Sequence, residues 1–262
     1  MNILCIGDVC GHIGCEYLRR HLPKLKKENC IDLVVANGEN SADGNGLLPN
    51  SAEHLFMSGV DIITGGNHIF KRREVYSLLD ENEFILRPGN FPASANGRGI
   101  AYLDLGYLTV AVINLLGVVY MEPLECPFKT ADMLIAEAKD HGARIIVVDF
   151  HAEATGEKKA LGYYLDGRVS AVVGTHTHVQ TADEQILPAG TAYITDIGMT
   201  GPINSVLGII PQLAISKQVD KMPVRFALAE GECMMSGCII EIDKTTGMAQ
   251  SIKRINIREG LK

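Results

Sequence analysis

The chain has 262 residues, of which 47% are hydrophobic and 21% are charged, and its net charge is -7. This composition is typical of a globular protein with a sizeable core, and we interpret residues 1–262 as a single domain. No basic block is longer than Lys71-Arg72-Arg73, so a broad basic surface for duplex nucleic acid is not expected.

The seven cysteines are odd in number and form no CxxC pair. We therefore expect reduced thiols rather than a disulfide framework. The chain shows no signal-peptide pattern and no apolar run of about 18 residues. These features predict a cytoplasmic protein that does not engage a membrane.

Short apolar runs alternate with helical patterns along the first third of the chain. Strands are predicted at residues 2–7, 31–37 and 60–64, and helices at 13–28, 50–58 and 70–81. Pro23 predicts a break or a restart inside the first helix, because proline removes a backbone donor.

The rest of the chain continues this alternation and adds hairpins. Strands are predicted at 84–87, 100–105, 107–115, 144–150, 169–173, 184–187, 191–195, 234–242 and 249–257, and helices at 129–141 and 157–166. Residues 203–231 contain two prolines, Pro211 and Pro223, and suggest a lid or cap insert. Alternating strands and helices, together with the hairpins, predict an α/β fold with mixed sheets.

Polar residues follow five of the predicted strands at their carboxyl ends. They are Asp8, Glu39, Asn67, His151 and the pair His176 and His178. Ligands of open α/β sheets bind at this edge, so we expect these side chains to share one cleft. His176 and His178 would face one spot if their strand continues through them, and Gly174 permits a turn just before.

This mixture of carboxylate, imidazole and amide-oxygen ligands suits borderline divalent ions, namely Mn, Fe, Zn, Co or Ni. It is too rich in nitrogen for a calcium site and lacks the thiolates of a structural zinc site. It offers enough ligands for two ions about 3.5–4 Å apart, which can activate a water and clamp a phosphoryl group. A histidine beside the ions would then protonate the leaving oxygen.

The motifs at these strand ends resemble those of the calcineurin-like metallophosphoesterase superfamily. They are Gly7-Asp8, Gly38-Glu39-Asn40, Gly66-Asn67-His68, His151 and Gly174-Thr175-His176-Thr177-His178, in the same order over most of residues 1–200. The longer stretches GGNHIF, RPGNFP, DFHAEATGEK and GTHTHVQTAD resemble the bacterial YmdB-like phosphodiesterases. This resemblance implies a four-layer α/β sandwich of two mixed β-sheets flanked by helices.

The resemblance also implies a role for each site residue. Glu39 would bridge two metal ions, with iron or manganese expected, and His68 would be the general acid. The other ligands would be Asp8, Asn40 and His178 for one ion, and Asn67, His151 and His176 for the second. The implied substrates are small phosphodiesters, in particular 2′,3′- or 3′,5′-cyclic nucleotides.

Two positions depart from the wider superfamily. Cys10 stands where the D-x-H motif of that superfamily has histidine. We expect Asn40 to fill the place of this histidine and Cys10 to lie outside the ligand set. Glu39 replaces the usual bridging aspartate, and its longer side chain leaves the metal identity open.

Four further polar residues lie close to these motifs in the sequence. Glu153 and Lys158 either support the metal ligands from behind or are solvated, and we favour the solvated interpretation. Arg87 and Asn90 either approach the substrate or only shape a turn.

The leading hypothesis is a dinuclear metal-dependent phosphodiesterase, in which a metal-activated hydroxide attacks phosphorus and His68 protonates the leaving ribose oxygen. The alternative is a signalling or scaffold protein that binds a nucleotide at the metal site with little turnover, although a pure binder needs no acid at His68. Metal-dependent amide hydrolysis fits less well, because the chain has no HExxH motif. The sequence leaves a homo-oligomer open.

Overall fold

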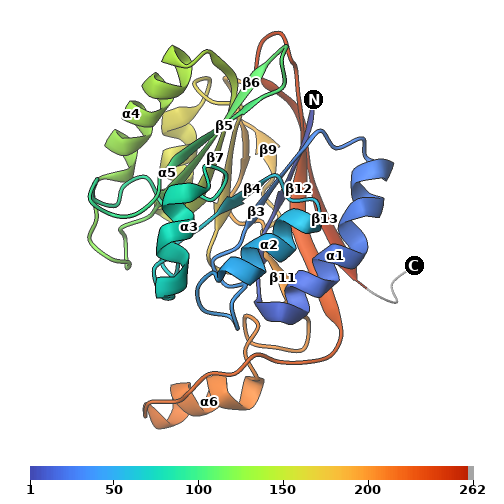
Figure 1. Ribbon diagram of the computed structural model, residues 1–262, viewed down its shortest axis with the longest axis vertical. Coiled ribbons are helices and arrows are strands. Elements are labelled where there is room, and N and C mark those ends of the chain that lie inside the picture. Colours follow the sequence, from blue (N-terminus) through green and yellow to red (C-terminus); the bar gives the residue numbers. More distant parts are fainter. Residues whose placement is uncertain (259–262) are drawn as a thin grey trace.

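In a computed structural model that describes residues 1–258, two β-sheets pack face to face between two layers of helices (Figure 1). One sheet is covered by α1 (Gly11–Glu28), α2 (Pro49–Met57) and α3 (Tyr76–Glu81). The other is covered by α4 (Pro127–Asp140) and α5 (Thr155–Leu165). The predicted four-layer α/β sandwich of two mixed sheets is confirmed.

The first sheet has seven strands in the order β2–β11–β12–β1–β3–β4, with β13 paired to β12. Their bounds are Asn2–Ile6 for β1, Asp8–Val9 for β2, Leu33–Asn37 for β3, Ile62–Thr64 for β4, Met199–Pro202 for β11, Cys233–Ile242 for β12 and Ala249–Arg258 for β13. Strands β1, β3 and β4 run parallel, so their carboxyl ends lie at one edge. The closing pair β12–β13 is antiparallel.

The second sheet has six strands in the order β5–β6–β7–β8–β10–β9. Their bounds are Ile100–Asp104 for β5, Thr109–Leu116 for β6, Ala143–His151 for β7, Ala171–Thr175 for β8, Gln185–Ile186 for β9 and Ala192–Ile194 for β10. Strands β6, β7, β8 and β10 run parallel, and β5–β6 is the predicted antiparallel hairpin.

Strand residues alternate between the two faces of each sheet, and this alternation divides the core into layers. In β1, Ile3 and Cys5 pack toward the second sheet, whereas Leu4 and Ile6 pack toward α1 and α2. All four are at most 1% exposed. Full burial of an aliphatic side chain contributes about 1.5–3 kcal/mol relative to exposure. The core between the sheets therefore holds the strand ends of both sheets in fixed positions.

Three local predictions differ from the structure. Helix α1 continues through Pro23 without a break. Pro23 has no N–H for the carbonyl of Arg19, but both residues are exposed, so water can bind this carbonyl. The predicted helix at 70–81 is a 3₁₀ turn, Arg73–Val75, followed by α3. The predicted strand at 84–87 forms only isolated bridges.

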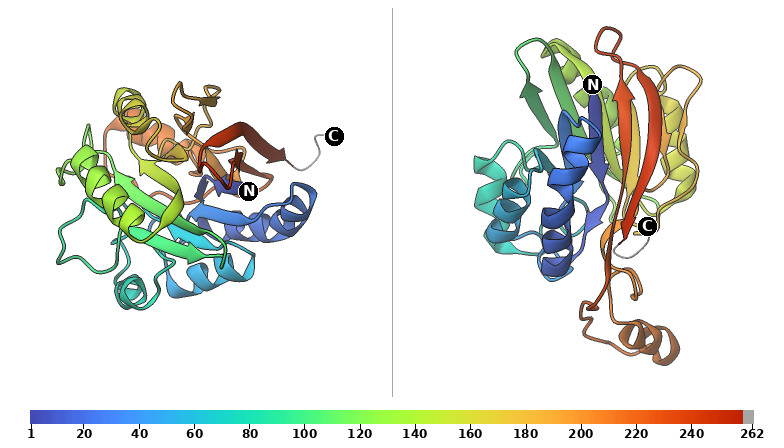
Figure 2. Two further views of the ribbon diagram at one scale, coloured as in Figure 1. Left: turned by 90° about the horizontal axis from the view of Figure 1, so that it is seen from above. Right: turned by 90° about the vertical axis from the view of Figure 1, so that its right-hand side faces the viewer.

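One segment leaves the body, and we name residues 206–228 the arm. Its two ends are joined by an antiparallel bridge between Ile209 and Leu228, and its middle forms α6 (Pro211–Asp220). The arm projects from the body at the edge where the parallel strands of the first sheet end (Figure 2). No residue of α6 is buried. The segment that contains the prolines is therefore a projecting helix on a two-stranded stalk.

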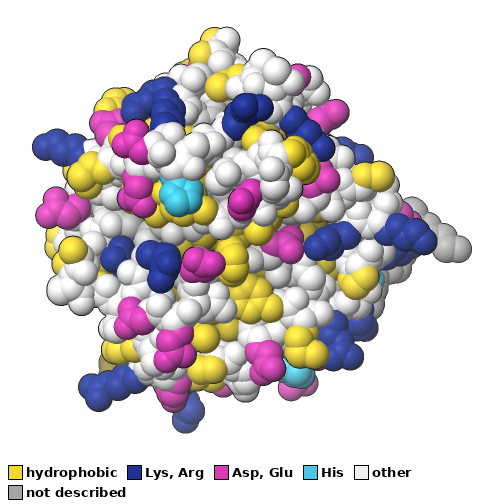
Figure 3. All heavy atoms as spheres, turned by 45° about the horizontal axis from the view of Figure 1, so that its top comes forward, with side chains coloured by type: hydrophobic (Ala, Val, Ile, Leu, Met, Phe, Trp, Pro, Cys, Tyr) yellow, Lys and Arg dark blue, Asp and Glu magenta, His cyan; other side chains and the backbone are white. Residues whose placement is uncertain are grey.

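Charged side chains of both signs are spread over the body. On the face that Figure 3 draws, lysine and arginine side chains are interspersed with aspartate and glutamate side chains (Figure 3). A continuous basic stripe, which binding to a duplex backbone requires, is absent from the described residues on this face. Within residues 1–258, no helix is long and apolar enough to cross a membrane.

Candidate metal centre

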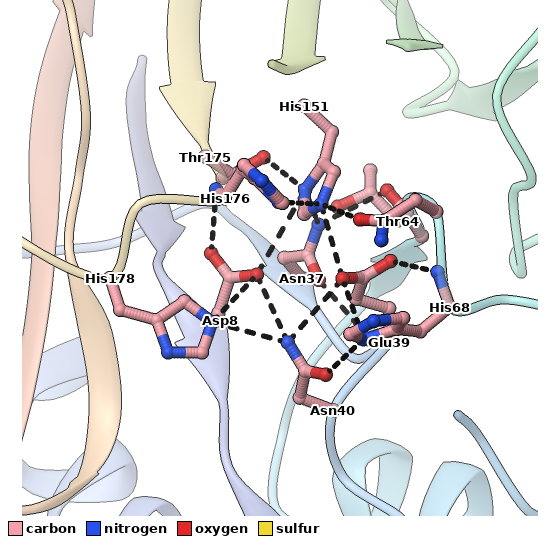
Figure 4. Close-up of polar contacts among 12 residues, drawn as sticks. Asp8, Asn37, Glu39, Asn40, Thr64, His68, His151, Thr175, His176 and His178 are labelled. Carbon is pink, nitrogen blue, oxygen red and sulfur yellow. Dashed lines mark hydrogen bonds and ion pairs between the residues drawn. The ribbon is translucent and has the colours of Figure 1, made fainter. Parts of the chain in front are cut away.

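A buried polar cluster lies where the carboxyl ends of strands from both sheets meet (Figure 4). Asp8 begins β2 directly after β1, Glu39 follows β3, and His151 ends β7. Each of these side chains is at most 1% exposed. Buried ionisable groups are costly without partners, so each must be matched by another polar group.

Three side chains converge on the Nε2 atom of His151. This atom lies 3.0 Å from Asn67 Oδ1, 3.0 Å from His176 Nδ1 and 3.1 Å from Glu39 Oε1. One imidazole nitrogen carries at most one hydrogen and cannot satisfy three such neighbours. Ligand atoms of Glu39, His151 and His176 all lie within 4.8 Å of one another. One carboxylate, two imidazoles and an amide oxygen at this spacing suit a borderline divalent ion.

A second group adjoins the first through Asp8. Its Oδ1 lies 3.6 Å from His178 Nε2 and 3.5 Å from Asn40 Nδ2. Its Oδ2 accepts a hydrogen bond of 3.2 Å from the backbone N–H of His176. Asn40 would present its oxygen to a cation after a half-turn of the amide, which exchanges Oδ1 and Nδ2. The two groups meet at Glu39, whose Oε1 is 3.4 Å from Asn40 Nδ2.

His68 lies beside both groups and is 32% exposed. Its backbone N–H donates a 2.8 Å hydrogen bond to Glu39 Oε2, and its Nδ1 lies 2.8 Å from Asn40 Oδ1. This second contact leaves Nε2 as the ring nitrogen for a bound molecule. Burial lowers the pKa of His68, and the carboxylate of Glu39 opposes this effect.

Both buried carboxyl groups favour ionisation. Burial alone would raise the pKa of Asp8, but His178 and His151 lower it below its usual value. Burial also acts against the ionised form of Glu39, yet His151 lowers the pKa of that carboxyl as well. Burial and the charge of His151 lower the pKa of His176 to about 4, which leaves it neutral at pH 7. Ionised carboxylates and a neutral imidazole are the forms that bind a cation.

In contrast to His176, the surrounding side chains favour the protonated forms of His151 and His178. Burial alone would lower the pKa of His151, but Glu39 raises it. Burial alone would also lower the pKa of His178, but Cys10 and Asp8 raise it. A bound cation would displace these protons, so affinity for it should increase with pH.

Gly66 keeps room at the centre of the cluster. A Cβ atom at this position would lie 2.3 Å from Glu39 Oε2 and 2.4 Å from His151 Nε2. Only glycine lets both side chains approach the backbone so closely. Together with the donor set, this space fits the divalent ions that the resemblance implies.

A buried polar layer behind His151 is absent from the sequence-based predictions. Thr175 Oγ1 lies 2.9 Å from His151 Nδ1 and donates a 2.7 Å hydrogen bond to Asp149 Oδ1. Thr64 donates to the other oxygen of Asp149, and Asn37 Nδ2 lies 3.4 Å from His151 Nδ1. This layer orients the ring so that Nε2 faces the cluster. Burial raises the pKa of Asp149 to about 6. A carboxylate inside an apolar strand was the sequence signal for it.

The two histidines of the GTHTH motif line one cavity, but the prediction that they point the same way from a continuing strand is wrong. Strand β8 ends before them, and His176 and His178 have positive φ angles of 103° and 63°. The chain turns between them, so His176 approaches His151 while His178 approaches Asp8. Gly174 lies within β8, where a Cβ would come within 1.8 Å of a neighbouring backbone oxygen. It permits close packing rather than a turn.

Cys10 lies next to the second group. Its Sγ is 3.7 Å from Nδ1 of His178, the ring nitrogen that does not approach Asp8. The same Nδ1 lies 3.1 Å from the backbone oxygen of Leu207 in the arm. Cys10 and the arm therefore both contribute to the orientation of His178.

Glu153 and Lys158 differ from each other in solvation. Glu153 is 50% exposed, yet its Oε2 lies 3.1 Å from His176 Nε2. Lys158 is 1% exposed and pairs with Asp196 at 2.8 Å, so the interpretation of Lys158 as solvated is wrong. Asp196 also accepts a hydrogen bond from the backbone N–H of Thr177. The buried pair thus supports the turn that separates the two histidines of the GTHTH motif.

Arg87 and Asn90 shape a turn. Arg87 Nη1 donates to the carbonyl of Pro88, and Asn90 Nδ2 donates to the carbonyl of Leu116. Both side chains are buried, at 6% and 1% exposure. Of the two sequence-based alternatives, the structure therefore favours the turn.

A cavity of about 320 Å³ opens in front of the cluster. Its polar lining includes Glu39, Asn40, His68, His176 and His178, and its apolar lining is Leu207, Ile209 and Phe226 of the arm. This volume lies at the lower end of the range for small-molecule sites.

A family model described as YmdB-like protein matches residues 4–255. The chain belongs to the YmdB-like family. This membership confirms the resemblance to YmdB-like metallophosphoesterases. The YmdB-like chain is 48% identical over 259 residues to the 2′,3′-cyclic-nucleotide 2′-phosphodiesterase of Bacillus subtilis (strain 168), which covers 99% of this chain and 98% of that protein.

Solved structures agree with this assignment of the YmdB-like chain. The crystal structure of a novel phosphatase from Mycoplasma pneumoniae has a TM-score of 0.93 at 33% identity, and covers 98% of this chain and 93% of that chain. The NAD nucleotidase of Haemophilus influenzae has a TM-score of 0.64 at 14% identity, and covers 98% of this chain and 55% of that chain. The second likeness concerns the fold alone.

Proposed function

We propose that this protein is a dinuclear metal-dependent phosphodiesterase that hydrolyses small phosphodiesters, with 2′,3′-cyclic nucleotides as the leading substrates and 3′,5′-cyclic nucleotides as the second candidates. Its family and its 48% identity to a phosphodiesterase make the chain a hydrolase of phosphoester bonds. The observation that carries the proposal is the convergence of Glu39, His151 and His176 next to a cavity of about 320 Å³, which Glu39 and His176 line.

The ligand sets follow the two groups of the cluster. Asn67, His151 and His176 would hold one ion. Asp8, Asn40 and His178 would hold the other, and Glu39, which touches both groups, would lie between them. Iron or manganese is proposed, with zinc, cobalt and nickel as alternatives of the same ligand class. When bound, such ions lower the pKa of a water and balance the charge of the phosphoryl oxygens.

The side chains of the protein itself position the ester and supply a proton. After the half-turn that presents Asn40 Oδ1 to a cation, Asn40 Nδ2 would donate to His68 Nδ1, so His68 Nε2 would carry the ring proton toward the cavity. In a 2′,3′-cyclic nucleotide the group that departs is a ribose oxygen, which needs this proton to leave. The layer of Thr175 and Asp149 keeps His151 in one orientation throughout.

The test is hydrolysis by protein reconstituted without oxygen with Mn or Fe(II). The substrates are a phosphomonoester, a linear phosphodiester, and 2′,3′- and 3′,5′-cyclic AMP. Turnover of the diesters that is lost in Asp8→Ala, together with a lower metal content, supports the proposal. Asp140→Ala, which removes an exposed aspartate at the end of α4, is the matched control and should behave as wild type.

A folded protein that binds two metal ions and turns over none of these esters would contradict the proposal. That result would favour the nucleotide-binding alternative. The cytoplasmic location and any self-association stay predictions from the sequence.

A further inference from the structure

The cavity in front of the cluster has two chemically different walls. Its polar wall carries His68 and four of the candidate metal ligands, Glu39, Asn40, His176 and His178. Its apolar wall is formed by Leu207, Ile209 and Phe226, all from the arm. Phe226 is 50% exposed and Leu207 is 46% exposed. Exposed aromatic and aliphatic side chains that line a catalytic cavity are suited to the apolar part of a substrate.

The arm is anchored to the body, so this wall has a defined position. Leu228 packs where Cβ atoms at Gly11 and Gly44 would lie 2.1 Å and 2.8 Å from its side chain. Both glycines have positive φ angles, of 63° and 78°. The oxygen of Leu207 contacts Nδ1 of His178 at 3.1 Å. The apolar wall is thus tied directly to a candidate metal ligand.

The stalk of the arm is also held by its own backbone. Ile210 N–H donates a 3.0 Å hydrogen bond to the carbonyl of Ala227, and Ala229 N–H donates a 2.9 Å bond to the carbonyl of Gly208. On the strand that carries Phe226, both bonds are made by residues one and three positions after it. They fix the backbone next to the ring, although α6 has no buried residue.

We propose that Phe226, flanked by Leu207 and Ile209, is the platform on which the nucleobase of the substrate stacks. The inference rests on the proposed function, because it assumes that the cyclic phosphate occupies the polar wall. A nucleobase is a flat aromatic ring, and stacking on an aromatic side chain tolerates every base because each has a π face. The three side chains offer no hydrogen-bonding group, so the site recognises the presence of a base and not its identity.

The test compares substrates with and without a base. Wild type, Phe226→Ala and Phe226→Tyr would each be assayed as metal-loaded protein on adenosine 2′,3′-cyclic phosphate, uridine 2′,3′-cyclic phosphate and the cyclic phosphate of ribose alone. Phe226→Ala should raise KM about 5- to 150-fold for both nucleotides, since stacking contributes about 1–3 kcal/mol per base. It should change kcat, and all constants for the ribose ester, by less than twofold. Phe226→Tyr should restore KM.

A second readout does not depend on turnover. Adenosine 3′-monophosphate and ribose phosphate would be titrated calorimetrically into each metal-loaded variant, and only the nucleotide should bind more weakly to Phe226→Ala. Met222→Ala is the matched control, because Met222 is 65% exposed on the same arm and lines neither this cavity nor the apolar pocket beside Phe226.

The outcomes separate the two proposals. An equal rise in KM for the nucleotides and for the ribose ester would mean that Phe226 acts through the position of the arm. This result would overturn the proposal that Phe226 stacks on the base. Unchanged KM in Phe226→Ala would overturn it as well. Wild type that hydrolyses neither ester would instead overturn the proposed function, and the platform with it.

Discussion

The metal cluster and the arm meet at one cavity but are built in opposite ways. Asp8, Glu39 and His151 are at most 1% exposed and extend from strands that the inner core fixes. In the arm, Val219 and Met222 are 73% and 65% exposed, and no residue of α6 is buried. The cluster can change little without disturbing the sheets. Helix α6 of the arm can change its side chains without cost to the core, which suits a part that selects substrates.

The largest effect should come from His68, which lies at the boundary of the two regions. His68→Ala should lower kcat by about 10²–10⁴-fold, because the leaving oxygen loses its acid. Metal content should stay at the wild-type level, since the side chain is outside the proposed ligand set. Steady-state kinetics and metal analysis of the same preparation check both statements. Loss of metal from a folded His68→Ala protein would show that the role assigned to this residue is wrong.

An intermediate effect should come from Asp149 and would appear as pH-dependent stability. Its folded pKa of about 6 lies above the reference value of 3.8. The stability from its bound proton is therefore full below pH 4 and is lost as the pH rises to about 6. Asp149→Asn cannot lose this proton. Relative to wild type, its free energy of unfolding should rise by as much as about 3 kcal/mol over this window.

Chemical denaturation of metal-free protein at pH 4, 5, 6 and 7 measures this difference. Asp140→Asn provides the exposed-aspartate control and should show no such trend. A difference between Asp149→Asn and wild type that is constant with pH would mean that Asp149 is ionised in the fold at all these pH values.

The smallest effect should come from two exposed side chains of α6. The double change Ile215→Ala and Val219→Ala removes two exposed side chains, and the free energy of unfolding should change by less than about 0.5 kcal/mol. Turnover of the cyclic nucleotide should stay within twofold of wild type. Thermal melts and kinetics test this. A drop in stability comparable to a core substitution would show that the arm is not separate from the body, and would remove the contrast between the two regions.

Much of the architecture was predictable because the physical signals are local. The apolar runs that became β1, β3, β7 and β8 were found within a few residues of their observed bounds, since buried strands need continuous apolar side chains. Pro23 was misleading, because a proline on the exposed side of a helix costs less than one facing the core. Lys158 was misread as well, since nothing in its neighbours indicates the buried partner, Asp196, 38 residues later.

The sequence by itself determined the chemical nature of the centre, because carboxylates, amides and imidazoles at the ends of parallel strands must meet at one edge. Only the tertiary structure decided how the imidazole rings of the cluster are oriented. The positive φ angles of His176 and His178 send their rings to different partners, and the Thr175–Asp149 layer turns His151 toward Glu39. Likewise, only the fold brings Phe226 and His68 to the same cavity, because they are more than 150 residues apart in the sequence and no local pattern encodes their proximity.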